Sequence, residues 1–258
     1  MHAIRTTLGT VAVAFVLCAL GGCGGSGPPT AVQLGDAKIA QTSVEHWTKA
    51  LAGQAFVVDD GLPAPPAVLA NLANSSRCAT NVAPLVEKVR SASKASGKPA
   101  TAAQLQARCH ALYASAKQQA TEYLISVQVA LAEADKYGIK VSPADARRYL
   151  TNWKKTALAN PSEFGKYLAN RGWTLADELF DAKRSVLWLK LTQHLHGLAV
   201  ASGGGEKAYA DLLRTNAQQL AKQTRCSVAY MVPGCSGYRV PAHPLSSLAV
   251  AAERLVSG

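Results

Sequence analysis

Apolar residues recur at helical spacing along most of the chain. From Ala102 to Tyr137 no glycine or proline interrupts, and apolar side chains return every three or four residues. Gly138 follows, at the position where a left-handed residue commonly ends a helix. The pattern predicts one long amphipathic helix over 102–137, preceded by a short helix over 81–92.

Three further helix starts are marked by a capping residue followed by proline or by an acid at the third helical position. They are SPAD at 142–145, NPSE at 160–163 and TLAD at 174–177. The second helix is predicted to end near Gly172 and the third near His196. In the third helix the apolar stripe predicts that Leu175 and Leu189 lie inside. A last helix is predicted over 206–222, after the glycines of SGGG.

Strand signals lie near the two ends of the folded part. AVQLGDAKIA at 31–40 alternates around Gly35-Asp36 and predicts a hairpin. Thr42 and Glu45 then have the spacing of a capping box, the proline-rich stretch 59–68 is predicted to be irregular, and CSVAYMV at 226–232 predicts a strand. The predicted fold class is therefore mainly α, with a small β hairpin and strand pairing between the N- and C-terminal segments.

The first 22 residues differ from the rest, because a run from Leu8 to Leu20 has no charge and is too short to span a bilayer. LGGC at 20–23 has the form of a lipobox and resembles that of bacterial lipoproteins. The resemblance implies a lipid on Cys23 and a location at the extracytoplasmic face of the cell membrane. The alternative is an ordinary secreted protein. Residues 23–30 are predicted to be a flexible tether, 31–235 the folded domain and 236–258 a tail.

The net charge is +11, and removal of Arg5 with the signal peptide leaves +10. Such a surface favours anionic lipid headgroups, wall polymers or acidic polypeptides. Nucleic acid is not expected, since export removes most of it and the chain has no basic-aromatic motif.

Four cysteines remain after Cys18 and Cys23 are set aside: Cys78, Cys109, Cys226 and Cys235. An even number in an exported chain indicates two disulfides. Three pairings are possible, and the local pairs 78–109 and 226–235 are favoured. A metal site is the alternative, although no CxxC motif is present.

Catalytic motifs for phosphate, dinucleotide, zinc-protease or serine-hydrolase chemistry are absent from the sequence. Ser91 and Lys94 match SxxK by chance. His194 and His196 diverge on a helix and are interpreted as residues of its C-terminal end. Glu45-His46 is interpreted as part of a solvated face, and neither an enzyme nor a cofactor is predicted.

Two blocks resemble the chaperone domain of the SurA/PrsA family of exported foldases. The first is VQLGDAKIAQTSVEHW, with an aromatic at Trp47. The second contains YGIKVS followed by FGKYLANRGWT, where Phe164, Leu168, Gly172 and Thr174 fall on the family pattern. The resemblance covers about residues 31–232, and the T-R-C-x-x-x-Y-M-V-x-x-C ending is similar to lipoprotein members. An unrelated helical bundle is the alternative.

Members of this family commonly carry a parvulin-type prolyl isomerase domain at the point that corresponds to 201–205. Between Leu198 and Cys226 the sequence predicts one helix and no such domain. The resemblance therefore implies a chaperone domain without its isomerase.

The resemblance implies binding of unfolded or nascent exported polypeptides and assistance in their folding. Candidate client-binding residues are the aromatics that packing of a single apolar helical stripe does not account for. They are Trp153, Phe164, Tyr167, Trp173 and Trp188. One alternative is a working prolyl isomerase, and another is a lipoprotein adaptor that binds one fixed partner or an anionic wall polymer.

Overall fold

The structure is a computed structural model. It describes residues 28–55, 57–58, 62–63, 68, 71–92 and 98–239. The predicted signal peptide, Cys23 and residues 240–258 of the tail lie outside the described residues.

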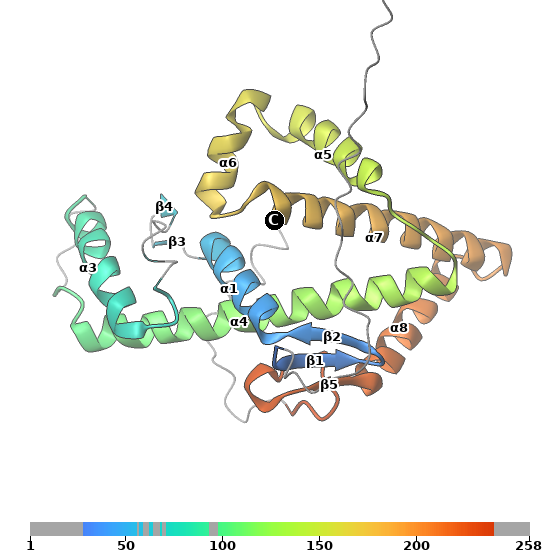
Figure 1. Ribbon diagram of the computed structural model, residues 1–258, viewed down its shortest axis with the longest axis horizontal. Coiled ribbons are helices and arrows are strands. Elements are labelled where there is room, and N and C mark those ends of the chain that lie inside the picture. Colours follow the sequence, from blue (N-terminus) through green and yellow to red (C-terminus); the bar gives the residue numbers. More distant parts are fainter. Residues whose placement is uncertain are drawn as a thin grey trace, which may run out of the picture.

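The described chain is mainly helical, with a small three-stranded antiparallel sheet (Figure 1). The helices are α1 (Gln41–Ala55), α3 (Ser75–Ala92), α4 (Ala102–Lys136), α5 (Pro143–Ala157), α6 (Phe164–Arg171), α7 (Leu175–Ala201) and α8 (Gly205–Gln223). The strands are β1 (Thr30–Leu34), β2 (Ala37–Ala40), β3 (Val57–Val58), β4 (Leu62–Pro63) and β5 (Thr224–Cys226).

The sheet joins the two ends of the folded part in the order β2-β1-β5. Val32 of β1 faces Ile39 of β2 on one side and Cys226 of β5 on the other. The predicted hairpin and the predicted pairing between N- and C-terminal segments are confirmed. The predicted strand over 226–232 is wrong in its bounds, because β5 ends at Cys226 and a 3-10 turn follows at Val228–Tyr230.

Helix α4 is the long central helix against which the other elements are arranged (Figure 1). Its 35 residues span about 52 Å at 1.5 Å per residue, and the predicted stop at Gly138 is confirmed by a left-handed φ of 64°. Helix α3 packs near the N-terminal end of α4, where Cys78 and Cys109 form a disulfide at the centre of a buried cluster. Helix α1 crosses the middle of α4 and contributes Val44 and Trp47 to the main core.

Helix α7 is buried on more than one face, because it contacts α5, α4 and α8. Ala182 packs against α5, whereas Leu187 packs against Ala130 and Ala134 of α4. The predicted single stripe is therefore wrong at Leu175 and Leu189, which are 52% and 53% exposed. The helix also extends to Ala201, beyond the predicted end near His196.

The SGGG segment is a tight turn between α7 and α8. Only residues 202–204 separate the two helices, so no domain is inserted there. Gly203 and Gly205 have φ angles of 76° and 52°, which side-chain-bearing residues avoid. A Cβ on Gly204 would lie 2.4 Å from the Cβ of Ala208. At each of these three positions a residue with a side chain would be strained or would clash.

Several predicted boundaries differ from the structure. Helix α1 begins at Gln41, so Thr42 lies inside its first turn and not at the N-cap position that the predicted capping box with Glu45 requires. Helix α3 begins at Ser75 rather than 81, because Asn74 accepts the N–H of Arg77 and Pro84 is tolerated on an exposed face. Strands β3 and β4 pair within a stretch that was partly predicted to be irregular.

No helix in the part of the chain that the structure describes is long and apolar enough to cross a bilayer.

Candidate functional site

Three of the five aromatics that the sequence predicts to bind clients lie on one surface. Trp153 of α5 lies 5.0 Å from Tyr167 of α6, centroid to centroid, and Phe164 lies 6.0 Å from Tyr167 with the rings nearly parallel. All three side chains are partly exposed. We call this surface the arm face, because α5 and α6 form an arm that stands on α7, away from the sheet (Figure 1).

Local sequence signals fix the arm. Ser142 caps α5 through a reciprocal capping box with Asp145, and that backbone hydrogen bond is the main reason why the pKa of Asp145 falls to about 2. Asn160 accepts the N–H of Ser162 and starts the turn into α6. Gly172, with φ 66°, ends α6 in a left-handed cap. The turn into α6 brings Phe164 and Tyr167 beside Trp153.

Cations lie directly on the rings of this surface. The Nζ atom of Lys154 is 4.6 Å from the centroid of Phe164, and the guanidinium of Arg171 is 5.1 Å from that of Tyr167. Arg171 also donates a hydrogen bond to the Tyr167 hydroxyl. Burial lowers the pKa of Arg171, which still leaves it charged. The arm face is thus both aromatic and cationic.

The other two predicted aromatics do not belong to this surface. Trp173 is only 6% exposed, and its indole N–H donates to the carbonyl of Ala50 at 2.8 Å, so it is a core residue. The prediction that Trp173 binds clients is therefore wrong. Trp173 fits no helical stripe because it lies in the turn after Gly172, from which its side chain points toward α1. Trp188 packs against the junction of α4 and α7, in a separate cluster.

An aromatic cluster beside the arm, which is buried or partly buried except for the exposed Phe180, joins α1, α4 and α7. The ring of Trp47 lies 4.6 Å from Tyr123, 5.3 Å from Phe180 and 5.5 Å from Trp173. Sequence reasoning missed Tyr123 as a junction residue and Phe180 altogether. Tyr123 lay on the predicted stripe of the long helix, but no local signal shows which helix it meets.

Polar contacts at the start of α7 join it to α1 and α4. His46 of α1 lies 2.6 Å from the carboxylate of Asp177, which also accepts the backbone N–H of Thr174. The Tyr123 hydroxyl donates to Asp181 at 3.0 Å. The predicted solvated Glu45-His46 face is thus partly wrong, because His46 bridges two helices.

Two acids in this junction have opposite pKa shifts. Burial alone would raise the pKa of Asp177, but hydrogen bonds from Thr174 and His46 outweigh it and lower the pKa. Burial raises the pKa of Glu178, whose Oε2 atom has no hydrogen-bond partner. These contacts fix the position of the start of α7 against α1 and α4.

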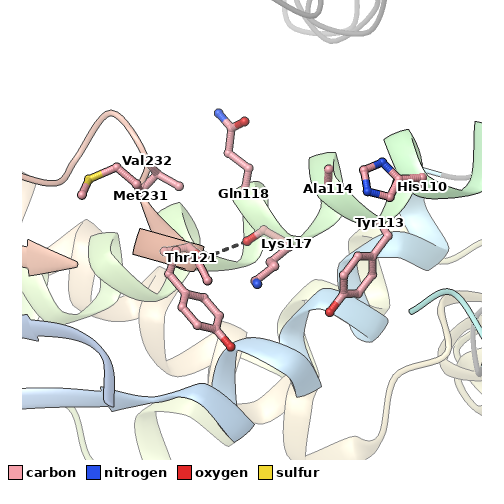
Figure 2. Close-up of a pocket in the computed structure, with 10 residues that line it drawn as sticks. His110, Tyr113, Ala114, Lys117, Gln118, Thr121, Met231 and Val232 are labelled. Carbon is pink, nitrogen blue, oxygen red and sulfur yellow. Dashed lines mark hydrogen bonds between the residues drawn. The ribbon is translucent and has the colours of Figure 1, made fainter. Parts of the chain in front are cut away.

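A second candidate site is a groove along α4, with a volume of about 310 Å³. One wall is a stripe of α4 that includes His110, Tyr113 and Lys117, and the other is the loop 229–232 that follows β5. Figure 2 shows Tyr113 and Lys117 extending to the same side of α4, toward α1, and Gln118 to the other. The Nζ atom of Lys117 lies 4.0 Å from the ring centroid of Tyr230.

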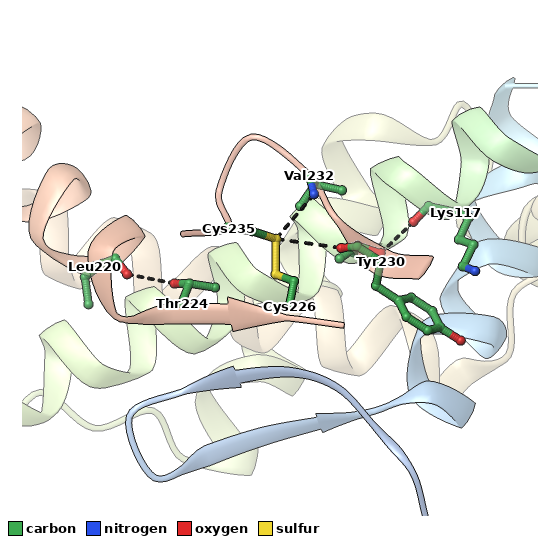
Figure 3. Close-up of a disulfide and its surroundings, with 8 residues drawn as sticks. Lys117, Leu220, Thr224, Cys226, Tyr230, Val232 and Cys235 are labelled. Atoms are coloured by element: carbon green, nitrogen blue, oxygen red, sulfur yellow. Dashed lines mark hydrogen bonds between the residues drawn. A yellow bond between two sulfur atoms is a disulfide. The ribbon is translucent and has the colours of Figure 1, made fainter. Parts of the chain in front are cut away.

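The disulfide between Cys226 and Cys235 holds the loop wall of this groove (Figure 3). The disulfide sulfur of Cys235 accepts the N–H of Val232 at 3.3 Å, and Ser236 donates its N–H to the Thr224 carbonyl at 2.7 Å. Both favoured cysteine pairs are the pairs found. Sequence reasoning missed the groove, because its walls are about 110 residues apart in the chain.

The groove combines a cation, phenol groups and apolar atoms. Burial raises the pKa of both Tyr113 and Tyr230, and the negative charge of Glu45 adds to each shift. Both phenols therefore stay protonated at neutral pH. Such a lining can hold a carboxylate or phosphate against Lys117 and hydrogen-bond to it.

The remaining predicted chemistry takes structural roles. The ring of His194 lies against that of Tyr137, with centroids 4.6 Å apart and the rings tilted, and His196 lies 2.9 Å from Glu206 of α8. Both histidines lie inside α7 and not at its C-terminal end. The hydroxyl of Ser91 approaches Glu87 at 3.4 Å, while Lys94 lies outside the described residues. Within the described ranges no three metal-ligating side chains cluster.

No protein-family model, curated protein or solved structure matches this chain. The arm face and the groove therefore have to be interpreted from their own geometry.

Proposed function

We propose that the protein is a non-catalytic, chaperone-like lipoprotein that binds unfolded exported polypeptides on the arm face and assists their folding. One observation carries the proposal: Trp153, Phe164 and Tyr167, from two helices, form a continuous aromatic surface that stays partly exposed. Apolar surface that is left partly exposed in this way can mark a binding site. A surface built of aromatic rings can accept many different apolar side chains.

The resemblance to the SurA/PrsA family supports the same proposal. The sheet that joins the two ends and the short turn between α7 and α8 agree with a chaperone domain that lacks its inserted isomerase. In this proposal a lipid on Cys23 holds the domain at the extracytoplasmic face of the membrane. No cofactor takes part.

The test follows light scattering while a chemically unfolded client is diluted in the presence of the protein. We expect stoichiometric amounts to suppress aggregation of several unrelated clients, also at moderate salt, because apolar contacts resist screening. The double variant Trp153→Ser with Tyr167→Ser should lose most of this suppression.

A matched control is Tyr209→Ser, which removes a partly buried aromatic from α8, away from the arm. Circular dichroism establishes that each variant is folded. Equal suppression by the arm variant and the control would remove the arm face from the proposal. No suppression by the unaltered protein would remove the chaperone function itself.

The groove favours a second candidate, an adaptor that binds one partner or an anionic wall polymer. Lys117 makes no ion pair within the described residues, and its groove is preformed by a disulfide-held loop. An adaptor of this type would cosediment with isolated cell walls. Lys117→Gln would then reduce cosedimentation but leave the suppression of aggregation unchanged.

A further inference from the structure

We infer that the arm face selects client segments in which a carboxylate lies two residues from a large apolar side chain. The inference rests on the proposed function, since it names the class of polypeptide that the same surface takes.

Positive charge is concentrated on the arm. Residues 139–172 contain seven Lys and Arg and two Asp and Glu, a net charge of +5. This is nearly half of the +11 of the whole chain, on about one eighth of its length. Of the two acids, Asp145 is already engaged by Arg148 and Lys190. The arm therefore presents a strongly positive surface.

Three lysines of the arm have no acidic partner among the described residues, unlike several cations elsewhere. Arg90, Lys136 and Arg214 each pair with an acid three residues earlier on their own helix. On the arm, Lys155 and Lys166 are exposed, Lys154 lies over the Phe164 ring, and none of the three makes an ion pair among the described residues. These ammonium groups are available to a ligand.

The spacing of cation and ring sets the spacing required of the client. Lys154 Nζ lies 4.6 Å from the Phe164 centroid. An extended polypeptide advances about 3.3 Å per residue and points alternate side chains to the same face, so side chains two residues apart lie about 7 Å from each other on one face. An apolar side chain on the aromatic surface thus brings a carboxylate two residues away within reach of the flexible Lys154 side chain.

The experiment compares three labelled peptides with identical apolar residues, in which the residue two positions from each apolar side chain is acidic, amide or basic. Fluorescence anisotropy at low and at moderate ionic strength measures their binding to the protein. We expect the acidic peptide to bind about tenfold more tightly than the amide peptide at low salt, the effect of two or three exposed ion pairs. The basic peptide should bind most weakly, and the differences should shrink with salt.

Two triple variants locate the effect. The arm variant is Lys154→Gln, Lys155→Gln and Lys166→Gln, and the control is Lys88→Gln, Lys207→Gln and Lys222→Gln, which removes the same charge from exposed positions on α3 and α8. The arm variant should lose the acidic preference and still bind the amide peptide. The control should keep the preference.

The outcomes separate the two proposals. If acidic and amide peptides bind equally, or if both variants lose the preference equally, the inference is wrong and client binding still stands. If no peptide binds, the proposed function fails as well. If the arm variant changes only binding to vesicles of anionic phospholipid, the cations serve the membrane and the inference is overturned.

Discussion

Replacement of Trp173 by phenylalanine tests whether this residue belongs to the core or to a client-binding surface. The structure places it in the core, 6% exposed, with its indole N–H bonded to the Ala50 carbonyl. Loss of that buried hydrogen bond costs about 1 kcal/mol. The smaller ring leaves unfilled space beside Trp47, which costs a further 1 to 2 kcal/mol, roughly a third of a full aromatic truncation. The free energy of unfolding should fall by about 2 to 3 kcal/mol.

Urea unfolding followed by circular dichroism at 222 nm measures this change without relying on tryptophan fluorescence. With a slope of about 2 kcal/mol per molar urea, the midpoint should fall by about 1 M. Trp188→Phe is the matched control, because Trp188 is only partly buried and makes no side-chain hydrogen bond in the described part of the chain. Its midpoint should move by less than half as much.

Client binding gives the second measurement. At a temperature where Trp173→Phe is folded, it should suppress client aggregation as well as the unaltered protein. An unchanged midpoint together with lost suppression would mean that Trp173 is a surface residue, and the placement of the turn between α6 and α7 would be refuted.

Four further changes probe other parts of the fold. Replacing both cysteines by alanine should cost about 3 to 4 kcal/mol for the Cys78–Cys109 pair and 2 to 3 for Cys226–Cys235, because their loops span 31 and 9 residues; urea unfolding should rank them in that order. Glu178→Gln should raise the urea midpoint at pH 7 but not at pH 3, since burial raises this pKa and the folded protein loses stability as the pH rises through it. Asp177→Asn should flatten the loss of stability on acidification, because a lowered pKa gives stability that is present above about pH 4 and is lost as the pH falls through the folded value. Gly204→Ala should lower the free energy of unfolding by about 1 to 3 kcal/mol through its clash with Ala208; an unchanged urea midpoint would show that the turn is looser than described.

Local sequence signals predicted the helices well. The predictions failed where contacts between distant segments determine the structure. Capping residues at 142, 160 and 174 all start helical segments, as expected. The apolar run after Cys226 resembles a strand, but Tyr230 donates its N–H to the Ser227 carbonyl and the disulfide to Cys235 turns the chain back. Apolar composition alone does not distinguish a strand from such a loop.

The candidate site was predictable only in part, for a similar reason. Trp153, Phe164 and Tyr167 stand out as aromatics beyond the needs of a single stripe, and they do meet. Trp173 has the same sequence signature, yet its partner Ala50 is 123 residues away. One wall of the groove is a loop near the C-terminal end of the domain that packs against α4. The spacing of Tyr113 and Lys117 on one helix could therefore not reveal the groove.

The arrangement of α7 explains how the arm could work next to a membrane. Its N-terminal end is fixed to α1 and α4 by His46–Asp177 and Tyr123–Asp181, and its C-terminal end leads through α8 to β5 in the sheet. The sheet and the arm lie on opposite sides of α4 and α7 (Figure 1). If Cys23 carries the lipid, as proposed, the seven residues to Thr30 can span at most about 25 Å, which keeps the sheet near the bilayer. The arm face would then project away from the membrane, where an emerging polypeptide can reach its aromatic rings and unpaired lysines.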